Sequence, residues 1–238
     1  MSLWAYGVGQ NYAGPQRSRG GAMALSVFGD YAQRAAPNLL IASQYERRPT
    51  EVADLKGARL VFSVEVDQEK RLAEAQVKDL SGGDRKKARF MRQDYFEFEQ
   101  TFDIVLSVKH KPVVLGTDPG IWRRIRLIPF ETQIPVKEQR PQDALVSDLL
   151  QDRAAILNWL IAGLHDYPKD PKWVAEEVQS ATDTYREEMD HIGKFIADAC
   201  EIIPRATVPV AKLYATYLAW CRQQDEDPVH KNAFGTAM

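Results

Sequence analysis

The sequence predicts an α/β fold, in which buried strands alternate with helices along the chain. Three short apolar runs predict the strands. The first lies within 57–65 and the second within 102–108. The third follows the arginine pair at 123–124 and ends at residue 130. Apolar residues recur at helical spacing in 68–80 and again in 141–167. Strands that alternate with helices are typical of a sheet flanked by helices.

Length and composition favour an ordinary globular protein. The chain has 238 residues, of which 45% are hydrophobic and 27% charged, enough for one medium-sized domain and a small appendage. No apolar run reaches the roughly 18 residues that a membrane helix needs, and no secretory signal opens the chain. Cys200 and Cys221 lack metal-ligand spacing and predict buried thiols in a reducing cytoplasm. We therefore expect a cytoplasmic protein without a membrane partner.

Two carboxylates follow the first predicted strand. Glu65 ends this strand and Asp67 comes two residues later. An acid at the tip of a buried strand is poorly placed for packing, but it is well placed to bind a metal ion or to orient a water. The alternative is an ordinary acid in the turn between a strand and a loop.

A basic segment follows the predicted helix 68–80 and its stop at 81–84. Residues 85–92 contain five basic side chains in eight positions, with Phe90 and Met91 among them, and the alternating segment 95–99 completes a predicted β-hairpin. The net charge of −2 and the pI of about 6.1 mean that any nucleic-acid contact must come from such a local patch. Cations follow phosphates and aromatic rings stack on bases, whereas the alternative is a solvated charged hairpin. We expect Lys86 and Lys87 at its tip.

The succession from Gly57 to Phe130 resembles the helicase module of phage and plasmid primase-helicases. These proteins are related to the poxvirus primase-helicase and belong to helicase superfamily three, within the AAA+-like P-loop ATPases. Glu65 occupies the position of the family's Walker B acid, and Lys78 with 81–84 matches the next helix and turn. Residues 116–130 match the arginine-bearing block. The resemblance implies a P-loop sheet with flanking helices that binds ATP and Mg²⁺.

The resemblance also implies roles for individual residues. Glu65 would be a catalytic residue and a metal ligand. Arg123 or Arg124 would reach the neighbouring subunit's ATP as an arginine finger, whereas the alternative for this pair is exposed arginines on an edge strand. The family works as a hexameric ring on single-stranded DNA. The implied DNA-binding residues are Lys78, Arg85, Lys86, Lys87 and Arg89.

The sequence departs from the family pattern at two nucleotide-binding positions. The family's glycine-rich turn corresponds to Gly7, Gly9 and Asn11, but the expected Gly-Lys-Ser/Thr does not follow, and 12–23 interrupts the pattern instead. Arg17 or Arg19 could replace the missing lysine. Lys109 stands where the family has an asparagine that senses the γ-phosphate, and a lysine cannot supply an amide's paired donor and acceptor. We therefore expect impaired nucleotide binding.

The C-terminal half is predicted to be helical. The apolar stripe of 141–167 is expected to be core, and 168–171 to be a linker. Residues 208–222 form an amphipathic helix, and 204–238 resembles the winged-helix appendix of these primase-helicases, cut off within its recognition helix. We expect domains at 1–135, 136–203 and 204–238.

Two functions follow from these expectations. The first is a phage- or plasmid-type replication primase-helicase, ancestrally an ATP-dependent helicase, whose nucleotide binding is impaired. The alternative is a catalytically silent module, derived from such a helicase, that binds DNA or assembles into rings. An ATPase with an unconventional phosphate loop is disfavoured by the missing lysine and asparagine.

Overall fold

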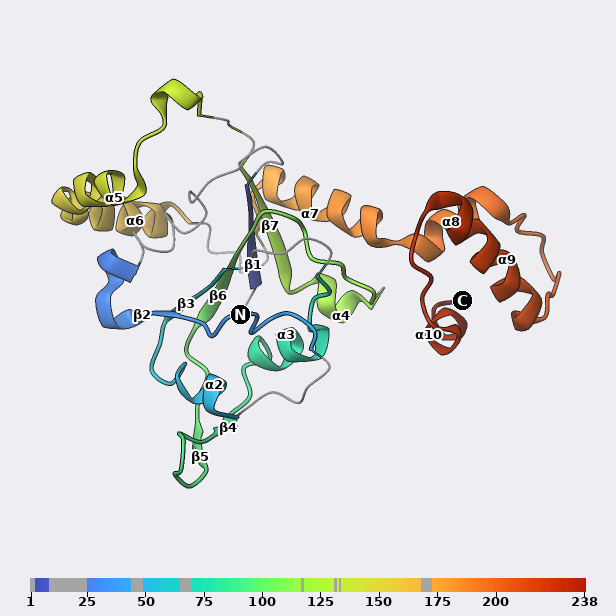
Figure 1. Cartoon of the computed structure of the whole chain (residues 1–238), viewed down its shortest axis with the longest axis horizontal. Coiled ribbons are helices and arrows are strands. Elements are labelled where there is room, and N and C mark those ends of the chain that lie inside the picture. The colour runs from blue at the N-terminus through green and yellow to red at the C-terminus, as the bar shows by residue number, and fades with distance from the viewer. Residues whose placement is uncertain are drawn as a thin grey trace.

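The computed structural model has the predicted α/β architecture (Figure 1). It describes residues 3–8, 25–43, 49–64, 70–116, 118–130, 132, 134–167 and 173–238. Helices surround a central sheet. A separate group of helices, α8 to α10 within residues 191–237, lies at the other end of the longest axis from α5 and α6, which lie within residues 142–166.

The central sheet has five strands in the order β2-β3-β6-β1-β7, and every pair is parallel. The strands are β1 Leu3–Val8, β2 Ala32–Arg34, β3 Leu60–Val64, β6 Asp103–Val108 and β7 Ile125–Phe130. The three predicted strands are thus confirmed as β3, β6 and β7. Buried residues run continuously through β3 and most of β6, as expected for a parallel sheet covered on both faces.

Short helices connect the strands. The helix predicted at 68–80 is shorter than expected, because Arg71 pairs with Val113 and Leu72 with Ile41 in isolated bridges before the helix begins. Helix α2, Pro49–Ala53, starts at a proline and precedes Gly57, which has a φ of +84° that favours glycine. Helix α3, Glu74–Leu80, buries Val77 and Leu80. Helix α4, Pro119–Trp122, buries Ile121 and Trp122 before β7.

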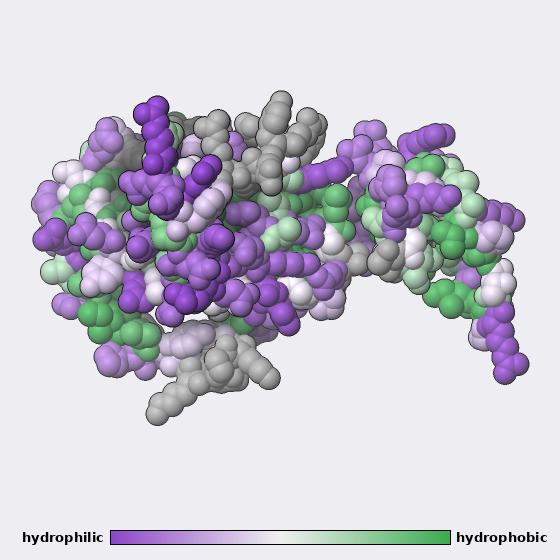
Figure 2. All heavy atoms as spheres, turned by 90° about the horizontal axis from the view of Figure 1, so that it is seen from below, coloured by the Kyte–Doolittle hydropathy of each residue, from purple (hydrophilic) through white to green (hydrophobic). Residues whose placement is uncertain are grey.

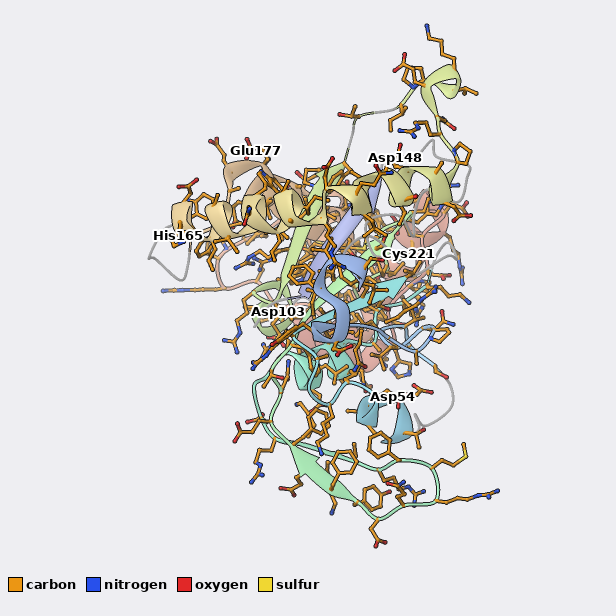
Figure 3. All side chains as sticks on the ribbon, turned by 90° about the vertical axis from the view of Figure 1, so that its left-hand side faces the viewer. Asp54, Asp103, Asp148, His165, Glu177 and Cys221 are labelled. Atoms are coloured by element: carbon orange, nitrogen blue, oxygen red, sulfur yellow. The ribbon has the colours of Figure 1, made fainter. Side chains whose placement is uncertain are left out.

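A two-stranded antiparallel hairpin separates α3 from β6, as predicted. It consists of β4 Lys86–Ala88 and β5 Phe96–Phe98, with Lys86 opposite Phe98 and Lys87 opposite Glu97. The hairpin projects below the sheet, beyond the end of β6 that begins at Asp103 (Figure 3).

Helix α7, Glu176–Met189, packs along the edge strand β7. The Leu127 amide donates to Thr182 Oγ1 at 2.9 Å, so a side chain satisfies a backbone donor of the edge strand. Tyr185 is buried in the main core, contacts Trp122 edge-on, and donates its hydroxyl hydrogen to the Pro112 carbonyl. Burial raises the pKa of the Tyr185 hydroxyl, which therefore stays protonated.

The last three helices form a second hydrophobic cluster. They are α8 His191–Ala199, α9 Val210–Gln224 and α10 Lys231–Ala237. At its centre Phe234 stacks on Tyr217 and is tilted against Phe195, and Phe195 contacts Tyr217 edge-on. The packing therefore groups α8 with α9 and α10, and α7 with the sheet.

The prediction that 141–167 contributes core is wrong. This segment forms α5 Gln142–Gln151 and α6 Arg153–Asp166, separated by Asp152, together with the short η3 Val136–Glu138 before them. None of the described side chains in α6 is buried. The apolar residues of α6 occur on all sides of the helix, so the periodicity that resembled a core-facing stripe does not identify a face that packs on the sheet.

Among the described helices, none is long and apolar enough to cross a membrane.

Candidate nucleotide and DNA sites

The carboxyl ends of the parallel strands define one candidate site. Gly7 in β1 pairs with Val108 at the end of β6, and Val64 at the end of β3 pairs with Ser107. The connection after β1 leads to β2, on one side of β1. The connection after β6 instead passes β1 and leads to β7 on its other side. Ligands of open parallel sheets bind outside the carboxyl ends at such a reversal of strand order. The reversal here lies between β1 and β6.

Lys109 directly follows β6 at this edge and is half-buried. Its neighbour Lys111 pairs with Glu188 of α7, which connects the loop after β6 to that helix. The structure therefore brings Gly7 and Lys109 to the same edge of adjacent strands. The other predicted nucleotide-site residues, Gly9, Asn11 and Glu65, lie outside the described residues, as do Asp67 and the segment 12–23.

The chemistry of this edge fits a phosphate group in part. A half-buried lysine at the end of β6 supplies a positive charge for a phosphate oxygen. Bound ATP would supply the phosphate anhydride, and Mg²⁺ would offset its charge. No group of three or more His, Cys, Asp or Glu side chains that could bind a metal occurs in the part of the chain that the structure describes. Glu65, the metal ligand that the sequence predicts, follows Val64 directly and lies outside the described residues together with Asp67.

The opposite, amino edge of the sheet carries a network around α4. Glu74 Oε1 accepts from the Leu115 and Gly116 amides at 2.9 and 2.8 Å, and Trp122 Nε1 donates to the Gly116 carbonyl at 2.9 Å. Asp118 caps α4 by accepting from the Gly120 amide at 2.7 Å. These bonds fix the turn that leads into the arginine pair.

Lys78, a predicted DNA-binding residue, belongs to this network. Its Nζ lies 2.5 Å from Asp118 Oδ2. The hydrogen bond from Lys78, followed by that from the Gly120 amide, holds the pKa of the Asp118 carboxyl below its usual range. Lys78 thus links α3 to α4. The predicted contact of Lys78 with DNA would have to replace its ion pair with Asp118.

The two arginines before β7 have different surroundings. Arg124 is half-buried and donates from its NH1 to the Gly120 carbonyl at 2.5 Å. Arg123 is exposed. A parallel strand of six residues spans about 20 Å, so Arg123 lies that far from the carboxyl edge of its own sheet. Arg123 is therefore the accessible one of the two arginines.

The prediction that Lys86 lies at the tip of the hairpin is wrong. Lys86 is 3% exposed, and its Nζ bonds the Asp79 carbonyl and lies 2.9 Å from Asp79 Oδ1. Lys87 is also in β4 rather than at the tip, although its side chain is exposed. Successive side chains of a strand point to opposite faces, so Lys86 faces α3 and Lys87 faces solvent. Lys86 therefore stabilises the base of the hairpin.

The actual tip is the loop 89–95, which combines cations with exposed aromatic and apolar groups. Arg89 Cζ lies 5.0 Å from the centre of the Tyr95 ring, and Lys87 Nζ lies 5.5 Å from the same ring. Phe90 stacks on Phe96 with ring centres 5.1 Å apart, while Met91 is exposed. Such a loop offers both a stacking surface and positive charge to a nucleic acid.

Acidic residues limit the positive charge of the hairpin. Arg85 Nε lies 4.0 Å from Glu97, and Asp84, Asp94 and Glu99 are exposed nearby. The cations lie on β4 and the tip, whereas most of the acids lie in the stretch from residue 94 onward. Phosphates would therefore approach the β4 side and the tip, where Lys87, Arg89 and Arg92 lie.

Sequence reasoning missed the roles of Glu74 and Asp118. Glu74 of α3 accepts from backbone amides of the turn before α4, and Asp118, the N-cap of α4, accepts from the Gly120 amide inside the helix. The Asp-Pro pair at 118–119 was an available signal, because Asp before Pro is typical of a helix start. Glu74 gave no such signal, because its partners are 41 and 42 residues away.

Comparison with known proteins agrees with this architecture. Residues 187–238 match the family described as Poxvirus D5 protein-like, and this range covers α8 to α10. A protein of Acanthamoeba polyphaga mimivirus named "Putative helicase" is 26% identical over 187 residues, which cover 71% of this chain and 20% of that protein. The chain thus spans about a fifth of the length of this curated relative.

Solved structures of the C-terminal region of NrS-1 share the fold. One apo form has a TM-score of 0.54 at 14% identity and covers 83% of this chain and 45% of its own. Another has a TM-score of 0.51 at 11% identity and covers 94% of this chain and 50% of its own. At low identity, the chain is therefore similar to a viral helicase and, over residues 187–238, to the poxvirus D5 family.

Proposed function

We propose that the chain is a module of a replicative primase-helicase of the phage and plasmid type, in which nucleotide binding is impaired and DNA contacts remain. One observation carries the proposal. The sheet places Gly7 and Lys109 at the carboxyl edge beside the reversal of strand order, and it places the hairpin and Arg123 at the amino edge. A ring helicase needs this separation, because its DNA contacts and arginine finger must lie away from its own nucleotide.

Residue roles follow from this separation. Lys109 would contact a phosphate, and Glu65 would bind Mg²⁺ or orient water if ATP were bound. Arg123 would act on the neighbouring subunit's nucleotide. Lys87, Arg89 and Arg92 would bind the phosphates of single-stranded DNA, with Tyr95 and Phe90 beside the bases.

The alternative is a catalytically silent module that binds DNA or joins rings of intact relatives. It is favoured by the absence of Gly-Lys-Ser/Thr from the whole sequence and by a lysine at the end of β6 in place of an amide. Both functions start from an impaired nucleotide site, and they differ in whether the chain works as a helicase module or only binds DNA or joins rings.

ATP binding with Mg²⁺ tests the impaired nucleotide site on which both functions rest. We would measure it calorimetrically for the parent chain, for Glu65→Gln and for a chain in which Gly-Lys-Ser is restored after Asn11. Impaired binding predicts heat of binding from the restored chain only. Turnover by the parent that rises with single-stranded DNA and disappears in Glu65→Gln would contradict the impaired site and establish a working ATPase.

A further inference from the structure

The two faces of the hairpin have different surroundings. On one face, Lys87 and Arg89 both lie over the Tyr95 ring. On the other face, Ala88 and Phe96 pair across the two strands, and Ala88 is buried while Phe96 is half-buried. Successive side chains of a strand point to opposite faces, so the basic side chains and the phenylalanine belong to different sides of the hairpin.

The face that carries Phe96 lies next to α2 and the turn after it. β4 contacts α2, and Figure 3 shows Asp54, which directly follows α2, close to the hairpin. Two residues later, Lys56 is exposed, and its Nζ lies 4.7 Å from the centre of the Phe96 ring. Phe96 also stacks on Phe90, whose side chain is 38% exposed. One shared ring therefore connects a cation from outside the hairpin to an accessible aromatic side chain.

No carboxylate neutralises the charge of Lys56. At the base of the hairpin Lys86 is held in an ion pair, whereas Lys56 forms none with the residues that the structure describes. The charged residues within five positions of Lys56 are Glu51, Asp54 and Arg59, so two acids and two bases lie in this stretch. Lys56 would therefore act on a phosphate as a single point charge and not as part of a basic patch.

We propose that Lys56 is a further contact for single-stranded DNA, in a subsite that also contains Phe90 and Phe96. A base would stack on the exposed Phe90 ring, while Lys56 binds a phosphate of the same strand. The strand would cross the tip from the face of Lys87 and Arg89 to the side of α2. The subsite rests on the DNA binding in the proposed function and adds a contact from outside the hairpin.

The surface on this side of the molecule suits such a path. Figure 2 views the molecule from below, the direction in which the hairpin projects in Figure 1, and hydrophilic residues cover most of this face. The alternative path along β5 would bring phosphates to the exposed Glu97 and Glu99. Like charges repel, so the side of α2 is the more favourable exit from the tip.

Two substitutions separate a DNA contact from a lysine that only covers the Phe96 ring. Lys56→Met keeps an unbranched apolar chain over the ring and removes the charge, whereas Lys56→Arg keeps the charge. Lys212→Met is the matched control, because Lys212 is exposed on α9, in the second hydrophobic cluster's unit. Affinity for a labelled single-stranded oligonucleotide would be measured by fluorescence anisotropy over a salt series.

Each phosphate contact with a single strand contributes about 0.7 to the slope of log affinity against log salt. We expect Lys56→Met to lower this slope by about 0.7 and to weaken binding about fivefold at about 0.1 M salt. Lys56→Arg and Lys212→Met should match the parent. Phe90→Leu should weaken binding without changing the slope, because stacking on a base releases no counterions.

A parental slope in Lys56→Met overturns the subsite, as does parental affinity in Phe90→Leu. If Lys87→Ala/Arg89→Ala/Arg92→Ala still weakens binding in that case, the DNA-binding hairpin of the proposed function stands and only the added contact fails. No binding by the parent at low salt overturns both the hairpin contacts and the subsite.

Discussion

Arg123 and Arg124 are adjacent in the chain and differ in what they contact, which gives the first prediction. Arg124→Ala removes the bond to the Gly120 carbonyl, and we expect it to lower the free energy of unfolding by about 1–2 kcal/mol. Arg123→Ala removes an exposed side chain and should change stability by less than about 0.5 kcal/mol. Urea unfolding followed by circular dichroism compares the two. Equal losses would contradict the different environments of the two side chains.

Asp118 gives a prediction of pH dependence. Its folded-state pKa is lowered, first by Lys78 and then by the Gly120 amide. The ionised carboxylate therefore stabilises the fold at pH values above the ordinary aspartate pKa of 3.8, and this contribution is lost as the pH falls through the lower folded-state pKa. An NMR titration should find the Asp118 pKa below 3.8, and Lys78→Met should move it back upward. An unchanged pKa in Lys78→Met would show that the ion pair does not form in solution.

At the scale of elements, α7 is expected to depend on one hydroxyl for its contact with β7. Thr182→Val leaves the Leu127 amide without its acceptor at a buried position, which should cost about 1–3 kcal/mol. Thr216→Val is the matched control, because Thr216 donates to the Lys212 carbonyl on an exposed turn of α9. Thermal unfolding of both variants tests the difference. A loss in Thr216→Val as large as in Thr182→Val would contradict the role of the edge bond.

The elements also show what the sequence could predict. β3, β6 and β7 are apolar and β-branched, so local patterning identified them. The hairpin was predicted from alternation, but its tip was misplaced because Lys86 bonds Asp79, a partner in α3 that the hairpin's own sequence does not indicate. The exposure of α6 could not be predicted from its sequence either. Periodicity shows which residues are apolar, but it does not show whether another element covers them.

At the scale of the whole molecule, the order of the strands was not available from the sequence. Placing β1 between β6 and β7 depends on pairings such as Gly7 with Val108 and Gly7 with Pro129, across about 100 residues or more. Those pairings put Lys109 and Arg123 at opposite edges. The resemblance to helicases drew attention to Lys109 and Arg123. Only the topology shows that the two residues lie at opposite edges of the sheet.

Binding to single-stranded DNA tests the central claim most directly. Fluorescence anisotropy with a labelled oligonucleotide would be measured over a salt series for the parent chain, for Lys87→Ala/Arg89→Ala/Arg92→Ala, and for Lys137→Ala, which removes an exposed cation remote in sequence from the hairpin. We predict binding that weakens with salt, and a slope of log affinity against log salt that falls by about 2 in the triple variant. Lys137→Ala should match the parent. No binding by the parent at low salt, or equal binding by the triple variant, would contradict a DNA-binding hairpin.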